Sequence, residues 1–196
     1  MISLKFRVFL SFFCGLVTMT FGQTENSMGK NNLTYDYTFY QGQWAAGGEI
    51  LAQGVVLGYS RYFTPRLFGE FSYGLMNFKG RNSYFYLDDD EMDFINMRTF
   101  TIGAGYDLFQ SKHFVFSTVL SYLRQSNEQL LLEYGSPDSG TYVRETGRAK
   151  DATLRIQFKP RIFVGEHFQI IPSYSYGFGL GKYKSDWLSL GLGYSF

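Results

Sequence analysis

Along most of the chain, apolar residues alternate one by one with small or polar residues, and this period of two limits the possible folds. The clearest case is the end of the chain, where apolar side chains alternate with serines and glycines: Leu188, Leu190, Leu192, Tyr194 and Phe196. Successive side chains of a β-strand point to opposite sides, so this segment is predicted to be a strand with one apolar and one small face. A helix would need a period near 3.6.

The same alternation predicts seven more strands, at residues 33–39, 54–60, 70–75, 99–108, 114–124, 152–162 and 168–180. The pattern is weakest at 114–124, because Val115, Val119 and Leu123 put apolar groups on both faces. Composition agrees with strands: 20% of the residues are aromatic and 22 of 196 are Gly, a mixture that suits pleated strands better than packed helices. The formal net charge of +1 gives no sign of a nucleic-acid partner.

The first 22 residues have the features of a cleaved secretory signal peptide. Lys5 and Arg7 precede an uncharged apolar run, 8–21, that is followed by a small residue. This run is shorter than the roughly 20 residues that a spanning helix needs. We therefore expect a signal peptide at 1–22 and a mature domain at 23–196.

The connections between the predicted strands alternate between short and long. Short connections lie at 64–66, 110–113 and 164–167, and the others run over 41–51, 79–96, 125–150 and 181–185. Short turns at one end, long loops at the other and an even strand number are typical of bacterial outer-membrane barrels. A closed ring of tilted strands leaves no unpaired edge in lipid. The chain is therefore predicted to be all-β, an eight-stranded antiparallel up-and-down transmembrane β-barrel in the outer membrane of a Gram-negative bacterium.

The alternative is a soluble eight-stranded barrel of the lipocalin kind, with the large apolar set inside as a ligand pocket. Ser, Gly and Thr suit a narrow lumen but would make a poor solvent face, which favours the membrane barrel. Aromatic residues at the strand ends also predict two interfacial belts. Those belts comprise Phe63, Phe109, Phe114, Phe163, Phe168 and Phe196 at the turn end, and Trp44, Phe78, Tyr122, Phe178 and Trp187 toward the loop end.

The last strand, which closes in Gly-Tyr-Ser-Phe, resembles the C-terminal signature of outer-membrane proteins. This resemblance implies that Leu192, Tyr194 and Phe196 form the signal that the barrel assembly machinery recognises. The eight-strand plan resembles the OmpX and OmpA-transmembrane type of small barrel, and residues 59–70 resemble the outer-membrane β-barrel domain common in Bacteroidota. The resemblance implies a fold and a location rather than an activity.

Charged residues occur on the face that is predicted to point inward. Arg155, Lys159 and Arg161 share this face of one strand, and Glu70 and Asp107 have the same parity on two others. Buried charges must pair. The sequence therefore predicts a salt-bridged luminal cluster that plugs the barrel, with an ion or proton path as the alternative. Eight strands leave an interior that side chains can fill, which favours the plug.

No catalytic, cofactor or metal site is predicted. The two histidines, His113 and His167, fall in or beside short turns, and Cys14 leaves with the signal peptide. The acidic run 88–93 lacks the Gly of an EF-hand loop. We therefore expect a structural or surface-interaction role, with loops 79–96 and 125–150 contacting lipopolysaccharide or a surface protein. The apolar run 130–132 predicts that the second of these loops extends its flanking strands above the membrane as a protruding hairpin, with an edge for strand addition. A lipid-modifying enzyme and a narrow transport channel are the alternatives.

Overall fold

The structure, a computed structural model, describes residues 30–43, 49–81, 95–134, 143–179 and 184–196. The predicted signal peptide and the boundary after residue 22 lie outside these residues. The described part contains eight strands: β1 (Asn31–Gln43), β2 (Glu49–Tyr62), β3 (Leu67–Arg81), β4 (Ile95–Gln110), β5 (Phe114–Tyr134), β6 (Val143–Val164), β7 (Phe168–Gly179) and β8 (Lys184–Ser195). No helix in the described part is long and apolar enough to cross a membrane.

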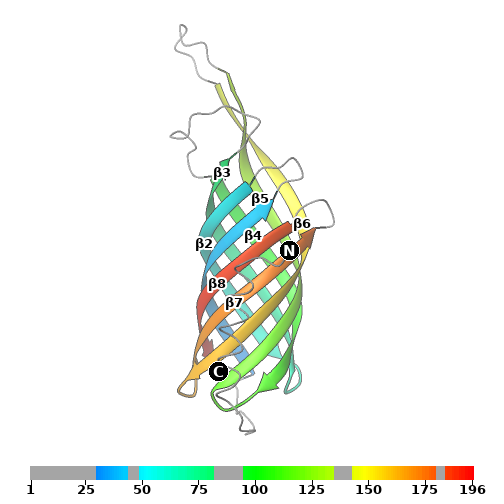
Figure 1. Cartoon of the computed structure of the whole chain (residues 1–196), viewed down its shortest axis with the longest axis vertical. Coiled ribbons are helices and arrows are strands. Elements are labelled where there is room, and N and C mark those ends of the chain that lie inside the picture. Colours follow the sequence, from blue (N-terminus) through cyan, green and yellow to red (C-terminus); the bar gives the residue numbers. More distant parts are fainter. Residues whose placement is uncertain (1–29, 44–48, 82–94, 135–142, 180–183) are drawn as a thin grey trace.

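The eight strands form one closed barrel in chain order (Figure 1). Each strand pairs antiparallel with the next, and β1 pairs antiparallel with β8. At the closing seam the Asn31 N–H donates to the Phe196 carbonyl over 3.0 Å, and the Phe196 N–H donates to the Asn31 carbonyl over 2.9 Å. The predicted fold class is confirmed, and the segments with the weakest alternation are full strands.

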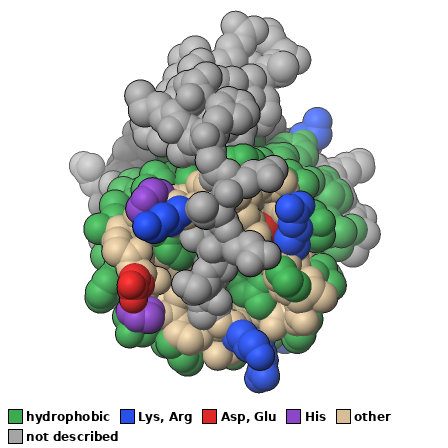
Figure 2. All heavy atoms as spheres, turned by 90° about the horizontal axis from the view of Figure 1, so that it is seen from below, with side chains coloured by type: hydrophobic (Ala, Val, Ile, Leu, Met, Phe, Trp, Pro, Cys, Tyr) green, Lys and Arg blue, Asp and Glu red, His purple; other side chains and the backbone are tan. Residues whose placement is uncertain are grey.

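The three described connections are short turns at one end of the barrel, the lower end in Figure 1. They comprise residues 63–66, 111–113 and 165–167. In the last of them Gly165 has a φ of 78°, a conformation that glycine adopts without steric cost. Figure 2, seen from this end, shows apolar side chains around the outer edge of the ring.

Side chains alternate between the two faces of the wall as predicted. On β8, Leu190 and Leu192 are 62% and 64% exposed on the outside, whereas Ser195 is fully buried on the inside. Several inward positions have no room for a side chain larger than hydrogen. A Cβ atom on Gly191 would lie 1.7 Å from Asp36 Oδ1, and one on Gly105 would lie 2.2 Å from the Phe68 ring. Glycine is therefore needed at these inward positions, because neighbouring side chains already occupy the narrow lumen.

The prediction of two aromatic belts is confirmed only in part. Phe63, Phe168 and Phe196 are exposed at the turn end, and Tyr122 and Phe178 are exposed outside. Three of the other residues are wrongly placed by the sequence, because they are buried: Phe114, Phe163 and Trp187. Phe163 and Trp187 have the parity of the inward set, and Phe114 packs against Phe109 with ring centroids 6.0 Å apart. Trp44 and the side chain of Phe78 lie outside the described residues.

Strands β5 and β6 continue beyond their neighbours as a two-stranded hairpin, which rises above the rest of the wall in Figure 1. Their pairing extends to Tyr134 opposite Val143, with a register shift near Leu130. Pairing with β4 ends at Asn127 and pairing with β7 ends at Thr153. Much of loop 125–150 is therefore strand, which confirms that this loop extends its flanking strands as a hairpin. The apolar alternation marks only the lower part of these strands, so it does not predict where they end.

The ladder between β6 and β7 is interrupted at two opposed prolines. Residues 159–161 and 171–173 are unpaired across this seam, and the register of the flanking pairs places Pro160 opposite Pro172 at its centre. A proline has no N–H to donate to a ladder.

The hydrogen bonds at the ends of both strands show which way these residues face. Phe163 donates its N–H to His113 beside β5, so the even-numbered residues of β6 direct their backbone groups toward β7. Ser195 of β8 donates to His167, so the even-numbered residues of β7 direct theirs toward β6. Both prolines therefore face the same seam, which lacks both bonds of that pair.

Candidate functional site

The lumen at the turn end holds a network around one buried carboxylate. Arg161 of β6 forms an ion pair with Asp107 of β4, with 2.6 Å between Nη2 and Oδ1. The other Asp107 oxygen accepts hydrogen bonds from the Tyr62 hydroxyl at 2.6 Å and the Gln110 amide at 2.8 Å. Ser117 donates its hydroxyl to Asp107 Oδ1 over 2.8 Å. Four side chains therefore compensate for the burial of Asp107, which is 0% exposed.

Aromatic rings lie over the other partner of this ion pair. The Arg161 guanidinium carbon lies 5.4 Å from the Phe68 ring centroid and 5.6 Å from that of Tyr62. Arg161 also donates hydrogen bonds to the hydroxyls of Tyr62 and Ser117. This surrounding holds a buried guanidinium through both charge and ring contacts.

A second ion pair joins strands on opposite sides of the barrel. Lys159 of β6 contacts Glu70 of β3, with 2.5 Å between Nζ and Oε2, and both side chains are buried. Arg155, four residues before Lys159 on β6, donates to the Ser121 hydroxyl at 3.3 Å. Its guanidinium carbon lies 5.7 Å from the Trp187 ring centroid. The five charged residues singled out in the sequence therefore all lie in the lumen, where the structure brings four of them together as two ion pairs.

Asp36 of β1 adds a third acid to this interior. Its side chain is 8% exposed and interacts electrostatically with Lys159 and Arg155, which attract it, and with Glu70, which repels it. The carboxylate oxygen Oδ1 has no hydrogen-bond partner among the described residues. Among the described residues, the buried charged side chains of the lumen are thus three acids and three bases.

A neutral network lies beside these charges near the barrel's closing seam. Asn32 of β1 donates to the Ser60 hydroxyl at 3.4 Å and accepts hydrogen bonds from Gln169 at 2.9 Å and Ser195 at 2.5 Å. Further along the lumen, Gln157 donates to Ser173 over 3.0 Å, which joins β6 and β7 from the inside. These amides and hydroxyls occupy the space that an aqueous path would need.

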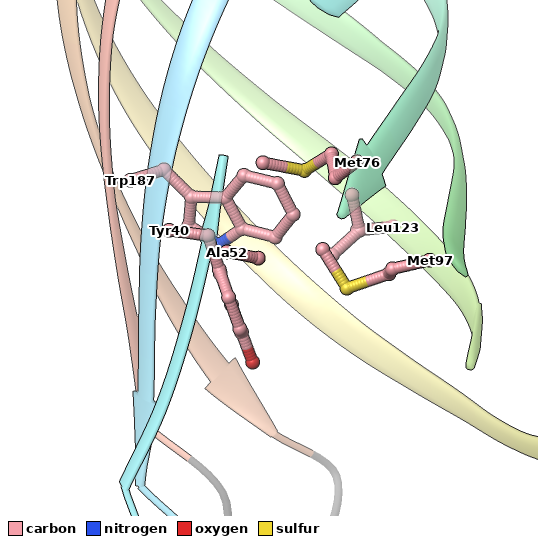
Figure 3. Close-up of a cluster of buried hydrophobic side chains, with 6 residues drawn as sticks. All are labelled: Tyr40, Ala52, Met76, Met97, Leu123 and Trp187. Carbon is pink, nitrogen blue, oxygen red and sulfur yellow. The ribbon is translucent and has the colours of Figure 1, made fainter. Parts of the chain in front are cut away.

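Toward the loop end the lumen is filled by apolar side chains instead. Figure 3 shows the side chains of this cluster turned toward one another from six different strands. The cluster consists of Tyr40, Ala52, Met76, Met97, Leu123 and Trp187. None of these residues is more than 6% exposed. The interior therefore has a charged lower part and an apolar upper part, and the alternation of the sequence predicts only the charged part.

No arrangement for catalysis is present among the described side chains. His113 and His167 both lie at exposed turns, and His167 Nδ1 contacts the backbone carbonyl of Ser195 at 2.9 Å. No group of three His, Cys, Asp or Glu residues in the described part could hold a metal ion. The acidic run 88–93 lies outside the described residues.

The three residues expected to form the assembly signal lie on the outer face of β8 and at the end of the chain. Leu192, Tyr194 and Phe196 are 64%, 41% and 52% exposed. The Tyr194 ring contacts the rings of Phe196 and Phe168, with centroids 6.2 Å and 5.3 Å apart. They form one apolar strip on the wall, and their role in assembly stays a prediction.

No protein-family model and no curated protein sequence matches the chain. Solved structures do match. Neisserial surface protein A (NspA) superposes with a TM-score of 0.63 at 12% identity, over 87% of this chain and 100% of that one. This chain has the fold of the small outer-membrane barrels.

Two further structures have the same fold. Ail, the attachment invasion locus protein of Yersinia pestis, matches with a TM-score of 0.57 at 15% identity, over 86% of this chain and 99% of its own. The outer membrane protein OprG from Pseudomonas aeruginosa matches with a TM-score of 0.58 at 10% identity, over 89% and 99%. The resemblance to small outer-membrane barrels that the strand plan indicated is confirmed at the level of the fold.

The buried ion pair at the turn end gives a prediction about stability. Asp107→Ala is expected to lower the free energy of unfolding by about 3–5 kcal/mol, because it leaves the Arg161 charge buried without a partner. The double variant Asp107→Leu with Arg161→Met is expected to recover most of this loss, because no charge is left unpaired. Denaturant unfolding of the refolded barrel, followed by tryptophan fluorescence, measures both. Lys112→Gln at an exposed turn is the control, and a single variant as stable as this control would contradict the role of the pair.

Proposed function

We propose that the chain is an integral protein of the outer membrane of a Gram-negative bacterium, with a side-chain-filled lumen and a structural or surface-interaction role. The observation that carries this proposal is the combination of an apolar outer wall with a closed interior that buries paired charges in its lower part. Leu190 and Leu192 expose large apolar side chains on the outside, while ion pairs such as Lys159–Glu70 are buried within. A protein in water would need the opposite arrangement, whereas lipid favours this one.

The filled lumen favours a structural role over transport. The Arg161–Asp107 and Lys159–Glu70 pairs occupy its lower part, and the apolar cluster around Trp187 closes its upper part. Water and ions would have to displace both. Porins with wide channels use about 16 strands, whereas eight strands enclose only enough space for side chains.

The hairpin of β5 and β6 favours a role in surface interaction. Residues 128–134 and 143–152 pair only with each other among the described strands, so the hairpin has two free edges. A free edge presents unpaired N–H and C=O groups to which an extended peptide can add as a further strand. The partner we propose is an extended segment of a surface protein. The names of two structural neighbours, a surface protein and an attachment invasion locus protein, support this kind of role.

An enzymatic role is not part of the proposal. The histidines lie at the turn end, and His167 Nδ1 contacts the backbone carbonyl of Ser195 rather than its hydroxyl. Mass spectrometry of lipid A from cells with and without the protein would reveal a change in acylation if a lipid-modifying activity existed.

Location is tested by cell fractionation. The protein is expected in the outer-membrane fraction, to migrate faster on a detergent gel before heating than after, and to begin at residue 23. A closed barrel resists detergent until heated because all its strands are paired into one ring. Recovery of the protein in the soluble periplasm would overturn the proposal.

Conductance is tested by reconstituting the purified barrel in planar bilayers. Single-channel recording is expected to show no steady conductance, because charged pairs and apolar side chains fill the lumen. A 16-stranded porin in the same bilayers serves as the positive control. A large and steady conductance from this protein would exclude the filled lumen as its working state.

The free edge of the hairpin is tested by a single backbone change. On β6, residue 148 directs its N–H away from β5, as the even-numbered residues of this strand do. Arg148→Pro removes this donor without removing a hydrogen bond of the hairpin, so it is expected to lower strand addition. Arg148→Gln, which keeps the N–H, is expected to behave as the wild type. Adhesion of expressing cells to epithelial monolayers, and cell–cell aggregation, measure the effect.

A variant that lacks residues 128–145 shows the largest loss of adhesion and aggregation that removal of the hairpin can cause. Heat-modifiable migration shows for each variant that the barrel has folded. Unchanged adhesion and aggregation after this excision would count against the hairpin as an interaction surface.

A further inference from the structure

Three exposed cations lie close together on the outer face of the wall, near the loop ends of β4, β5 and β6. They are Arg98, Arg124 and Lys150. Arg98 pairs with Ser126 on β5, and Ser126 pairs with Lys150 on β6, so the two cations flank one residue. Arg124 lies two residues from Ser126 on the same face. With strands about 4.8 Å apart, this basic patch spans roughly 10 Å between its outer strands.

Among the described side chains, the cations of the basic patch are gathered on one side of the barrel. On β2 and β3 the outward residues at the corresponding end are neutral, Gln53 and Asn77, and both are exposed. On β8 the outward Lys184 is accompanied by Asp186. The described side chains on the outer faces of β4, β5 and β6 include no acid, since Asp107 and Asp151 point inward. No ion pair or hydrogen bond joins the three cations to another described residue.

The same face is apolar directly beside the patch. Phe100 pairs with Arg124, and one step further along the strands Ile102 pairs with Tyr122. Phe100, Ile102 and Tyr122 are 44%, 55% and 40% exposed. A ligand that covers this face therefore meets cations at the loop end and hydrocarbon below them. Cations above an apolar surface match an amphiphile with an anionic head and apolar chains. A free anion would have no use for the apolar surface.

We propose that the basic patch binds the phosphate groups of an anionic lipid headgroup in the leaflet at the loop end of the barrel. The inference rests on the proposed location in the outer membrane and names a specific lipid site on the wall. Arginine suits phosphate because its planar guanidinium offers two parallel donors, and lysine adds a point charge. A cation on the lipid-facing wall is costly at the centre of the bilayer and tolerated near the headgroups. The acyl chains of the lipid lie along Phe100, Ile102 and Tyr122.

The test compares lipid retention by two triple variants of the full barrel. In the patch variant, R98Q, R124Q and K150Q remove the three cations. In the matched control, R61Q, R66Q and K112Q remove three exposed cations from the turn end. Each barrel is refolded in neutral detergent with diphosphoryl lipid A, and retained lipid is measured by native mass spectrometry. Heat-modifiable migration shows that each variant has folded.

The wild type and the control are expected to retain the lipid alike, and the patch variant to bind it far more weakly. Each cation near a membrane surface contributes about fivefold in affinity, so single patch variants are measurable if the triple variant does not fold. A dephosphorylated form of the lipid is expected to bind the wild type no better than it binds the patch variant.

Two results would overturn the inference. Equal retention by the wild type and the patch variant excludes the site, and equal loss in both triple variants means that total charge matters rather than the patch.

Inorganic phosphate at millimolar concentration is expected to compete poorly, and full competition would mean that the patch is a site for a free anion. Fractionation decides the location separately, so a barrel that resides in the outer membrane but fails to retain the lipid contradicts this inference alone.

Discussion

The rest of the structure depends on the closure of the backbone hydrogen-bond ring. Asn31 and Phe196, at opposite ends of the described chain, exchange two hydrogen bonds, and β1 pairs with β8 along twelve residues. Closure removes every free edge within the wall and gives each residue one of two directions, toward the lumen or away from it. With eight strands in the closed ring, the interior is only wide enough for side chains. The small inward residues, the apolar exterior and the buried charges all follow from this single geometric condition.

A narrow lumen makes the inward residues depend on one another. Asp107 is compatible with full burial because Arg161, Tyr62, Ser117 and Gln110 reach it from four other positions, and Arg161 in turn lies against two rings. Glycines such as Gly191 are needed where a neighbouring carboxylate already fills the space of a Cβ atom. The interior therefore behaves as a packed core made largely of polar groups, in which removal of one member leaves another unsatisfied.

The period of two was sufficient to predict the fold, because alternation along each strand is a direct consequence of closure around a narrow lumen. It also placed Glu70, Asp107, Arg155, Lys159 and Arg161 on the inner face, since parity alone decides the face. Pairing between distant strands is not encoded in parity, so the roles of Tyr62 and Ser117 were missed. Trp187 was assigned by residue type to an interfacial belt, although its parity with Ser185 and Ser189 indicated the lumen. The apolar run 130–132 predicts the hairpin, but the strand boundaries of β5 and β6 are not predicted, because a strand outside lipid has no need of apolar alternation.

The opposed prolines of β6 and β7 make one seam of the wall weaker than the others, because backbone hydrogen bonds are missing there. Over roughly 14 Å of strand, between the ladder pairs at 158/174 and 162/170, the seam has no backbone hydrogen bond. The carbonyls of Pro160 and Pro172 are each directed toward a proline nitrogen that has no hydrogen to donate. Gln157 and Ser173 join the two strands from the inside. The described ladders of the other seams skip single residues, at the register shifts near Leu108 and Leu131, and contain no gap of this length. The barrel wall is thus expected to open most easily between β6 and β7, and thermal fluctuations that separate neighbouring strands will be concentrated at this seam.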